Sequence, residues 1–233
     1  IAVSGRCLMS QHNSNASATR GACRQECRKE YKIIDEESKV EMKLRNNFVM
    51  SPKDLCTIGI LDQIIDAGVT VLKFEGRGRP PEYVDTVIRT YKEALEAIDQ
   101  GTFNEDKLKE WMDKLETVYN RGFSTGYYLG QKTDFWAETG NNQAKEKRIF
   151  VGTVQHYFAK NKVAEVKLEA FDLNKNDSII ITGVTTGLMR TVVTKMRDEN
   201  EKEIAHCVKK SVVTFKVPER VRKNDRVYIL EEK

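Results

Sequence analysis

The segment Val69-Thr-Val-Leu-Lys-Phe-Glu-Gly-Arg77 is the clearest guide to the fold of the first half of the chain. Its residues alternate as in a strand, with Leu72 and Phe74 on one face and Lys73 and Glu75 on the other. In TIM-type barrels, active sites are built at the C-terminal ends of the strands. Lys73 and Glu75 lie at the C-terminal end of this expected strand. We therefore predict a functional role for Lys73 and Glu75. The alternative is an ion pair that only fills the end of the barrel.

Short apolar strands and amphipathic helices alternate around this segment. Strands are expected at Ile1–Val3, Phe48–Met50 and Val69–Phe74. Helices are expected around Ile58–Ile65, from Pro81, and after Asn104. This order is typical of a parallel sheet covered by helices. Too few units are present for a whole sheet, so residues 1–120 are predicted to be the C-terminal portion of a (β/α) TIM-type barrel from a longer protein. Within them, the polar stretch from Ser10 to Lys43 is expected to be an insertion.

The pattern changes to short strands in the second half. Six are expected, separated by turn-like residues: Phe150–Tyr157, Ala164–Ala170, Ser178–Thr182, Thr191–Met196, Val212–Val217 and Arg226–Leu230. Such a series predicts a small all-β barrel or sandwich over residues 147–233. Residues 121–146 are predicted to be the linker between the two parts.

Composition excludes some classes of protein. With 39% hydrophobic residues among 233, the chain can bury a core. No apolar run reaches the ~18 residues of a membrane span, and the first residues do not look like a signal peptide. We therefore expect a cytoplasmic protein without a membrane partner.

Basic residues are concentrated near the end of the chain. The net charge is +4, yet residues 147–233 carry 18 basic and 12 acidic residues. Binding to an RNA backbone needs such a cluster on one face, whereas the alternative is a solvated barrel surface. The candidate RNA-binding residues are Lys209, Lys210, Lys216, Arg220, Arg222 and Lys223. No DNA partner is expected.

Four of the five cysteines, Cys7, Cys23, Cys27 and Cys56, lie within the first 56 residues. In a reducing compartment, clustered thiols are more often metal or iron–sulfur ligands than disulfides. Their spacing is not that of a zinc ribbon, and the alternative is a set of unrelated, partly buried thiols. Cys207 has no thiol neighbour in sequence and is expected in the core.

Several catalytic signatures are absent from the sequence. It has no phosphate-binding G-x-x-x-x-G-K-[ST], no H-E-x-x-H and no G-x-S-x-G. The three histidines lie in loop or β contexts, so a Ser-His-Asp triad has no evident base in the α/β half.

Five motifs resemble those of one family. They are Ser4-Gly-Arg-Cys-Leu-Met-Ser10, Arg20-Gly-Ala-Cys-x-x-x-Cys-Arg28, Ser51-Pro-Lys-Asp-Leu-Cys56, Lys73-Phe-Glu-Gly-Arg77 and Arg121-Gly-Phe-Ser-Thr-Gly126. In this order they resemble the U-thirty-two peptidase family, also called collagenase-like. Residues 147–233 resemble a small β-barrel that some members share with translation factors. The KFEGR strand and the added barrel look most like the transfer-RNA uridine 5-hydroxylation branch.

The resemblance implies a 4Fe–4S cluster, prephenate as co-substrate and transfer RNA as partner. Cys7, Cys23 and Cys56 match cluster-ligand positions. A fourth family cysteine would precede Ile1, unless Cys27 takes its place. A collagenase-like peptidase is the alternative function that the family name suggests.

Further roles are predicted around the expected barrel mouth, from residues that follow the expected strands. Lys73, Glu75 and Arg77 form the predicted catalytic set, in which Glu75 is an acid or base or orients an arginine. Arg6, Lys53 and Asp54 are the predicted substrate-binding residues, which reach the same rim. Arg6, Lys53 and Arg77 would hold a dicarboxylate through charge-assisted hydrogen bonds. Solvated loop charges are the alternative for Arg6, Lys53 and Asp54.

Overall fold

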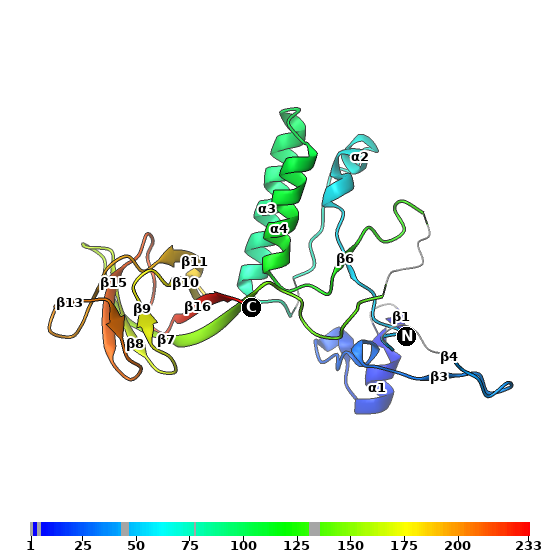
Figure 1. Ribbon diagram of the computed structural model, residues 1–233, viewed down its shortest axis with the longest axis horizontal. Coiled ribbons are helices and arrows are strands. Elements are labelled where there is room, and N and C mark those ends of the chain that lie inside the picture. Colours follow the sequence, from blue (N-terminus) through cyan, green and yellow to red (C-terminus); the bar gives the residue numbers. More distant parts are fainter. Residues whose placement is uncertain (1, 4–5, 43–46, 77, 131–135) are drawn as a thin grey trace. The chain divides into compact units, whose positions relative to one another are not determined.

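The computed structural model describes residues 2–3, 6–42, 47–76, 78–130 and 136–233, and the chain forms two compact units (Figure 1). Unit 1 comprises Ile1–Pro80 and Thr86–Ala144, and unit 2 comprises Pro81–Asp85 and Lys145–Lys233. Most of the predicted linker, up to Ala144, thus belongs to unit 1. The reason is that strand β6 (Phe123–Ser124) pairs within that unit. No helix in the described part of the chain is long and apolar enough to cross a membrane.

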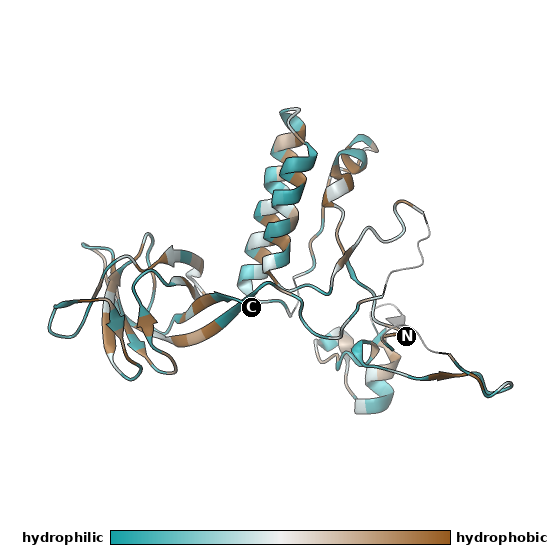
Figure 2. Cartoon of the chain, in the orientation of Figure 1, coloured by the Kyte–Doolittle hydropathy of each residue, from teal (hydrophilic) through white to brown (hydrophobic). Residues whose placement is uncertain are grey.

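Two long helices, α3 (Pro81–Asp99) and α4 (Glu105–Thr117), confirm the predicted helical segments. Proline suits the first turn of α3 because the backbone N–H groups of that turn have no acceptor within the helix. The missing N–H of Pro81 therefore costs no hydrogen bond. The Asn104 side chain accepts a hydrogen bond from Lys107 N at 3.0 Å and so caps α4. Both helices carry hydrophobic and hydrophilic stretches (Figure 2). Tyr91 and Trp111 are among the apolar side chains that they bury in the core of unit 1.

A shorter helical segment joins the same core. It consists of the 3₁₀ turn η3 (Ile58–Ile60) and α2 (Leu61–Asp66), and it buries Ile58 and Leu61 completely. Gly68 ends it with φ +88°, a conformation that glycine adopts without strain, as the sequence predicts.

Two of the predicted strands in unit 1 are wrong. Residues 69–74 belong to no strand, and Phe48–Met50 is irregular. A strand exists only where a neighbour accepts and donates its hydrogen bonds. The alternation of Val69–Phe74 survives nevertheless. Leu72 packs on the helical core and the Phe74 ring lies 4.9 Å from that of Tyr91, while Lys73 and Glu75 are exposed.

Short strand pairs complete unit 1. Strand β5 (Asp54–Leu55) pairs in parallel with β6, an arrangement that fits the predicted α/β pattern. Strand β1 (Ala2–Val3) pairs antiparallel with β2 (Arg6–Cys7), and β3 (Ile33–Ile34) with β4 (Glu41–Met42). Helix α1 (Leu8–Ser14) and the 3₁₀ turns η1 (Ala18–Arg20) and η2 (Glu26–Arg28) lie in the predicted insertion or at its edge.

Unit 2 is built on one eight-stranded antiparallel sheet, in the order β11-β10-β16-β7-β8-β15-β12-β13. Its strands are β7 (Glu146–Phe158), β8 (Val163–Leu168), β10 (Ser178–Gly183), β11 (Gly187–Val192), β12 (Met196–Arg197), β13 (Glu203–Ile204), β15 (Val212–Lys216) and β16 (Arg226–Glu232). A further pair joins β9 (Leu173–Asn174) to β14 (His206–Cys207). Five of the six predicted strands are confirmed. The expected strand Thr191–Met196 is instead shared between β11 and β12, because it breaks where the buried Val193 enters the core. Closure of this sheet into a barrel stays a prediction.

A buried carboxylate holds the turn before β16 in unit 2. Asp225 Oδ2 accepts hydrogen bonds from Arg222 N at 2.7 Å and from Thr186 Oγ1 at 2.5 Å. Gly183 makes this approach possible, since a Cβ there would lie 1.8 Å from Asp225 Oδ1. The guanidinium of Arg222 also donates to Thr186 Oγ1 at 3.2 Å.

Candidate functional site

Two of the four clustered thiols meet at one buried serine. Ser10 N donates to Cys7 Sγ at 3.4 Å, and Ser10 Oγ lies 3.6 Å from Cys23 Sγ. Ser10 is fully buried, and its hydroxyl also accepts from Arg24 N at 3.2 Å. Hydrogen bonds to Ser10 lower the pKa of the Cys7 thiol and so favour the thiolate. Thiolate is the form that binds metals.

The other two thiols do not join this pair. Cys56 lies in the helical core, with its Sγ 3.8 Å from Tyr91 Oη, and burial raises its pKa. Cys27 lies in η2 and is half-buried. In the described residues, no three His, Cys, Asp or Glu side chains converge in a way that could hold a metal ion. Among the described thiols, only Cys7 and Cys23 are thus brought to one place, where both contact Ser10.

The predicted catalytic and substrate-binding residues are in different environments. Lys73 and Glu75 are exposed, and Arg77 lies outside the described residues. Arg6 is exposed in β2 and lines a small pocket with Cys7 and Gln11. Lys53 is half-buried beside Gly122, where its Cγ and Cδ would lie 3.7 Å from an added Cβ.

Asp54 is the predicted site residue with the most informative contacts. Its carboxylate accepts from Arg121 twice, at 3.1 Å from the backbone N–H and at 3.3 Å from Nη1. These bonds link β5 to the residue before Gly122, across 67 positions of sequence. The Arg121 side chain is only 4% exposed. Arg121 is the first residue of the motif that ends at Gly126. Nothing in that motif indicates a contact between Arg121 and Asp54.

Two more arginines approach the same carboxylate or its partner. Arg79 Nη2 lies 3.9 Å from Asp54 Oδ1, and its Cζ lies 3.8 Å from the centre of the Tyr119 ring. Arg28 donates from Nη1 to Ser51 Oγ at 3.0 Å and to Pro52 O at 2.9 Å. Burial lowers the pKa of Arg28, and the neighbouring charge of Arg121 lowers it further. We call Arg28, Arg79 and Arg121, together with Asp54 and Tyr119, the arginine cluster.

The arginine cluster escaped prediction because its members are far apart in sequence. Arg28 and Arg121 sit at the ends of two motifs that the sequence singles out, yet no spacing rule connects them. Only the parallel pairing of β5 with β6 brings Asp54 to Arg121. The available signal in the sequence was the position of Arg28 and Arg121 at the boundaries of these two motifs.

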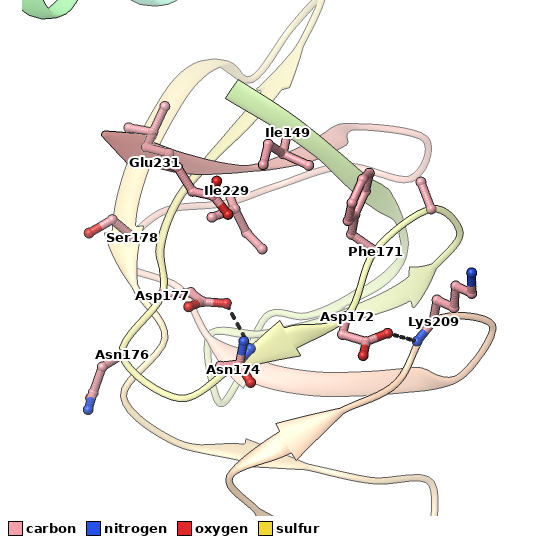
Figure 3. A pocket seen from close by; sticks show the side chains of 12 residues that line it. Ile149, Phe171, Asp172, Asn174, Asn176, Asp177, Ser178, Lys209, Ile229 and Glu231 are labelled. Atoms are coloured by element: carbon pink, nitrogen blue, oxygen red, sulfur yellow. Dashed lines mark hydrogen bonds between the residues drawn. The ribbon is translucent and has the colours of Figure 1, made fainter. Parts of the chain in front are cut away.

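Unit 2 contains a pocket of about 740 Å³, shown in Figure 3. Acidic side chains prevail over basic ones in its lining, which includes Asp172, Asp177, Glu231 and Lys209. Asp172 accepts from Lys209 N at 2.7 Å, and Asp177 from Asn174 N at 2.8 Å. Its lining therefore does not favour a phosphate ligand.

The predicted RNA-binding residues are on the surface of unit 2, with one exception. Lys209, Lys210, Lys216, Arg220 and Lys223 are exposed. Arg222 is half-buried and holds the Thr186–Asp225 network, which gives it a structural role. RNA binding by the five exposed residues stays a prediction.

The comparison with known proteins gives a family match and several relatives. The family model described as "Peptidase family U32" matches residues 1–138. A protein named collagenase from Porphyromonas gingivalis is 43% identical over all of this chain and 56% of its own length. The tRNA hydroxylation protein P1 of Bacillus subtilis is 28% identical over 95% of this chain and 53% of its own length. The chain thus spans about half the length of these relatives.

A solved structure is similar over a smaller part of the chain. The C-terminal domain of a U32 peptidase from Geobacillus thermoleovorans matches 34% of this chain and 96% of that domain, with 21% identity and a TM-score of 0.33. The family assignment rests instead on the match that covers residues 1–138, more than half of the chain. It includes every clustered cysteine and the whole arginine cluster. This chain belongs to peptidase family U32.

Proposed function

We propose that the chain is part of an iron–sulfur-dependent hydroxylase that forms 5-hydroxyuridine at the wobble position of transfer RNA, with prephenate as co-substrate. The observation that carries this proposal is the pair of thiols at Ser10. A buried serine that touches both Cys7 and Cys23 favours thiolate at Cys7, as a cluster ligand requires. Relatives named as tRNA hydroxylation proteins support the choice of substrate.

Unit 1 would supply the cluster ligands, and unit 2 would bind the RNA. Cys7 and Cys23 would hold one side of a 4Fe–4S cluster, which supplies redox chemistry when bound. Because the described residues bring no third ligand to these two thiols, we derive no reaction step through the cluster. The exposed basic residues of unit 2 would bind the RNA backbone by neutralising phosphates.

We propose that unit 1 is part of a TIM-type barrel, in which residues 69–74, which form no strand here, would lie against further residues of the longer protein. Leu72 packs against the helical core and Phe74 contacts Tyr91, as one face of a barrel strand would. Val71, on the other face, is 79% exposed. The parallel pairing of β5 with β6 has the strand direction of that barrel.

Nucleoside analysis tests the hydroxylase directly. The longer protein, with or without Cys7→Ser, is returned to a strain that lacks the gene, and 5-hydroxyuridine in transfer RNA is measured by mass spectrometry. Iron and sulfide are assayed anaerobically on the same proteins. Cys207→Ser is the matched control, because Cys207 is a buried thiol of unit 2. We expect Cys7→Ser to lose both iron and modified uridine, and the control to keep both. Full iron content in Cys7→Ser would contradict the proposal.

A collagenase-like peptidase is the second candidate, favoured by the relatives named collagenase at 43% and 42% identity over the full chain. Cleavage of gelatin by the protein without iron would support it. In unit 2, His206 lies between Asn174 and Asp172, but burial raises the pKa of the adjacent Cys207. A raised thiol pKa disfavours Cys207 as a nucleophile, and we keep the peptidase as the second candidate.

A further inference from the structure

We propose that Cys7 and Cys23 form a disulfide when a hydroperoxide oxidises the metal-free protein. The names of the relatives assign no redox modification to these residues. We call Cys7 and Cys23 the thiol pair, because both contact Ser10. The inference rests on the contacts of the two sulfur atoms, on the backbone that holds them and on their different exposure. It requires no hydroxylase activity.

The two sulfur atoms of the thiol pair meet at the same side chain. Cys7 Sγ accepts from Ser10 N at 3.4 Å, and Cys23 Sγ lies 3.6 Å from Ser10 Oγ. Hydrogen bonds from Ser10 lower the pKa of the Cys7 thiol, and the Cys23 thiol adds a smaller effect in the same direction. The two thiols are therefore close enough to interact. Proximity of the two sulfur atoms is the first requirement of a disulfide.

The backbone holds the segment around Cys23 against the start of helix α1. Arg24 N donates to Ser10 Oγ at 3.2 Å, and Gln25 N donates to Cys23 Sγ itself at 3.4 Å. Cys7 directly precedes α1 and caps it by accepting from the Ser10 N–H. Groups that are held close together react far faster than groups that must first find each other. The thiol pair is thus arranged for a reaction between its own members.

The unequal exposure of the two thiols sets the order of the reaction. Cys23 is exposed, whereas Cys7 is buried, with 8% of its surface exposed. The Cys23 sulfur attacks the hydroperoxide, the O–O bond breaks, and an alcohol leaves as Cys23 becomes a sulfenic acid. The Cys7 sulfur then attacks Cys23, the S–O bond breaks, and water leaves with the proton of the Cys7 thiol. The two thiols lose two electrons together, and the hydroperoxide is reduced to alcohol and water.

The other cysteines of unit 1 are placed less well for this reaction. Cys27 is half-buried in η2, and no hydrogen bond in the described part of the chain joins its thiol to Cys7 or Cys23. Cys56 lies in the helical core, where its sulfur contacts Tyr91 Oη. The geometry therefore predicts a single disulfide, although Cys23 and Cys27 are closer together in sequence.

The disulfide and a metal site at the thiol pair exclude each other. A sulfur atom that is engaged in a disulfide has no thiolate to offer as a ligand. Oxidation of the metal-free protein would therefore close this place to iron, and a thiol reductant would reopen it. The thiol pair would in this way carry a reversible, oxidant-dependent modification.

Peptide mapping tests the thiol pair directly. The 233-residue chain is prepared without metal, treated with hydrogen peroxide, alkylated, and digested with trypsin without reduction. Each of the five cysteines lies in its own tryptic peptide, because an arginine or lysine separates each from the next. We expect the peptide of residues 7–20 linked to that of residues 21–24 as the main product. A main product that links residues 21–24 to residues 25–28, or unlinked Cys23 oxidised to sulfinic acid, would overturn the proposal.

Variants show whether the recorded contacts govern the reaction. Ser10→Ala removes the hydroxyl that contacts Cys23 and should slow disulfide formation by about fivefold, the effect of one ordinary hydrogen bond. Ser17→Ala is the matched control, because its hydroxyl contacts that of Thr19. Cys27→Ser should form the disulfide at the parent rate. An unchanged rate in Ser10→Ala, or loss of the disulfide in Cys27→Ser, would contradict the proposal.

The fold and the hydroxylase are tested separately from the disulfide. Tryptophan fluorescence checks that Ser10→Ala keeps unit 1 folded, because Trp111 and Trp136 both lie there. The oxidation needs neither RNA nor iron. A protein that forms the disulfide but takes up no iron would leave the thiol pair standing and count against the hydroxylase. A protein that loses its iron with Cys7→Ser, yet never links Cys7 to Cys23 when metal-free, would count against the disulfide alone.

Discussion

Asp54 and Arg121 form a two-point contact, in which one carboxylate accepts both the backbone N–H and a guanidinium N–H of the same arginine, at 3.1 and 3.3 Å. The contact lies directly beside the hydrogen bond from Asp54 N to Gly122 O, at 2.9 Å. It therefore fixes where β6 begins as well as where the Arg121 side chain lies. Fold and candidate site depend on the same pair of residues.

Replacing Asp54 with asparagine should destabilise unit 1 by about 3 kcal/mol, because it leaves the buried charge of Arg121 without its partner. Urea unfolding followed by tryptophan fluorescence measures this change, since both tryptophans belong to unit 1. Glu36→Gln is the control. It breaks an exposed ion pair with Lys39 and should cost less than about 1 kcal/mol. Equal effects of the two substitutions would show that the Asp54–Arg121 contact contributes little.

Tyr91→Phe should destabilise the same unit by about 1–2 kcal/mol. The Tyr91 hydroxyl accepts from Thr57 N at 3.0 Å, and its loss leaves that donor unsatisfied. Burial raises the pKa of Tyr91 to about 12, so the hydroxyl stays neutral at ordinary pH. Tyr128→Phe removes a hydroxyl from an exposed side chain and should leave the urea midpoint unchanged. An unchanged midpoint in Tyr91→Phe as well would contradict the prediction.

Local signals in the sequence predicted part of this structure. Pro81 and Asn104 mark the starts of α3 and α4, and Gly68 marks the end of α2, because helix caps depend on neighbouring residues. In unit 2, alternating residues predicted most strands because their partners lie within the same unit. The pattern at Val69–Phe74 did not produce a strand, since no described segment pairs with it.

The candidate site was less predictable than the fold. Cys7 and Cys23 were predicted as ligands, but the serine between them was not, since Ser10 is recognisable only by its burial. Arg28, Arg79 and Arg121 come together through tertiary contacts that no local period encodes. Charge and residue type predicted an anion site at Arg6, Lys53 and Arg77, of which Arg77 lies outside the described residues, so this site stays a prediction.

Gly183→Ala should destabilise unit 2 by about 3 kcal/mol. The added Cβ would overlap Asp225 Oδ1 and break the bonds to Thr186 and Arg222. Gly187→Ala is the matched control. Nothing lies within 4 Å of its Cβ position, and only its φ of +71° is unfavourable, at about 1 kcal/mol. Hydrogen exchange of peptides from β10 and β16 compares the two variants. Equal protection in both would contradict the role of Asp225.

Cys207 should resist alkylation at neutral pH, because burial and the nearby carboxylates of Asp172, Asp198 and Glu199 raise its pKa above the ordinary 9.0. The folded state then holds the thiol proton more tightly than the unfolded chain. The stabilisation of the folded state that results is complete below the ordinary thiol pKa. It is lost as the pH rises through the pKa of Cys207 in the folded state. Peptide mass spectrometry after iodoacetamide treatment gives the labelling rate, with the exposed Cys23 as reference. Labelling of Cys207 as fast as Cys23 would contradict the raised pKa.

The place of β16 has a consequence for synthesis on the ribosome. This strand is last in sequence, yet it pairs with β10 on one side and β7 on the other, in the interior of the sheet. A nascent chain that ends before Arg226 therefore holds two separate groups of strands, β10–β11 and β7 with its further neighbours. Their inner edges stay open for misplaced pairing until the closing strand leaves the exit tunnel. Vectorial folding of unit 2 must wait for its final residues.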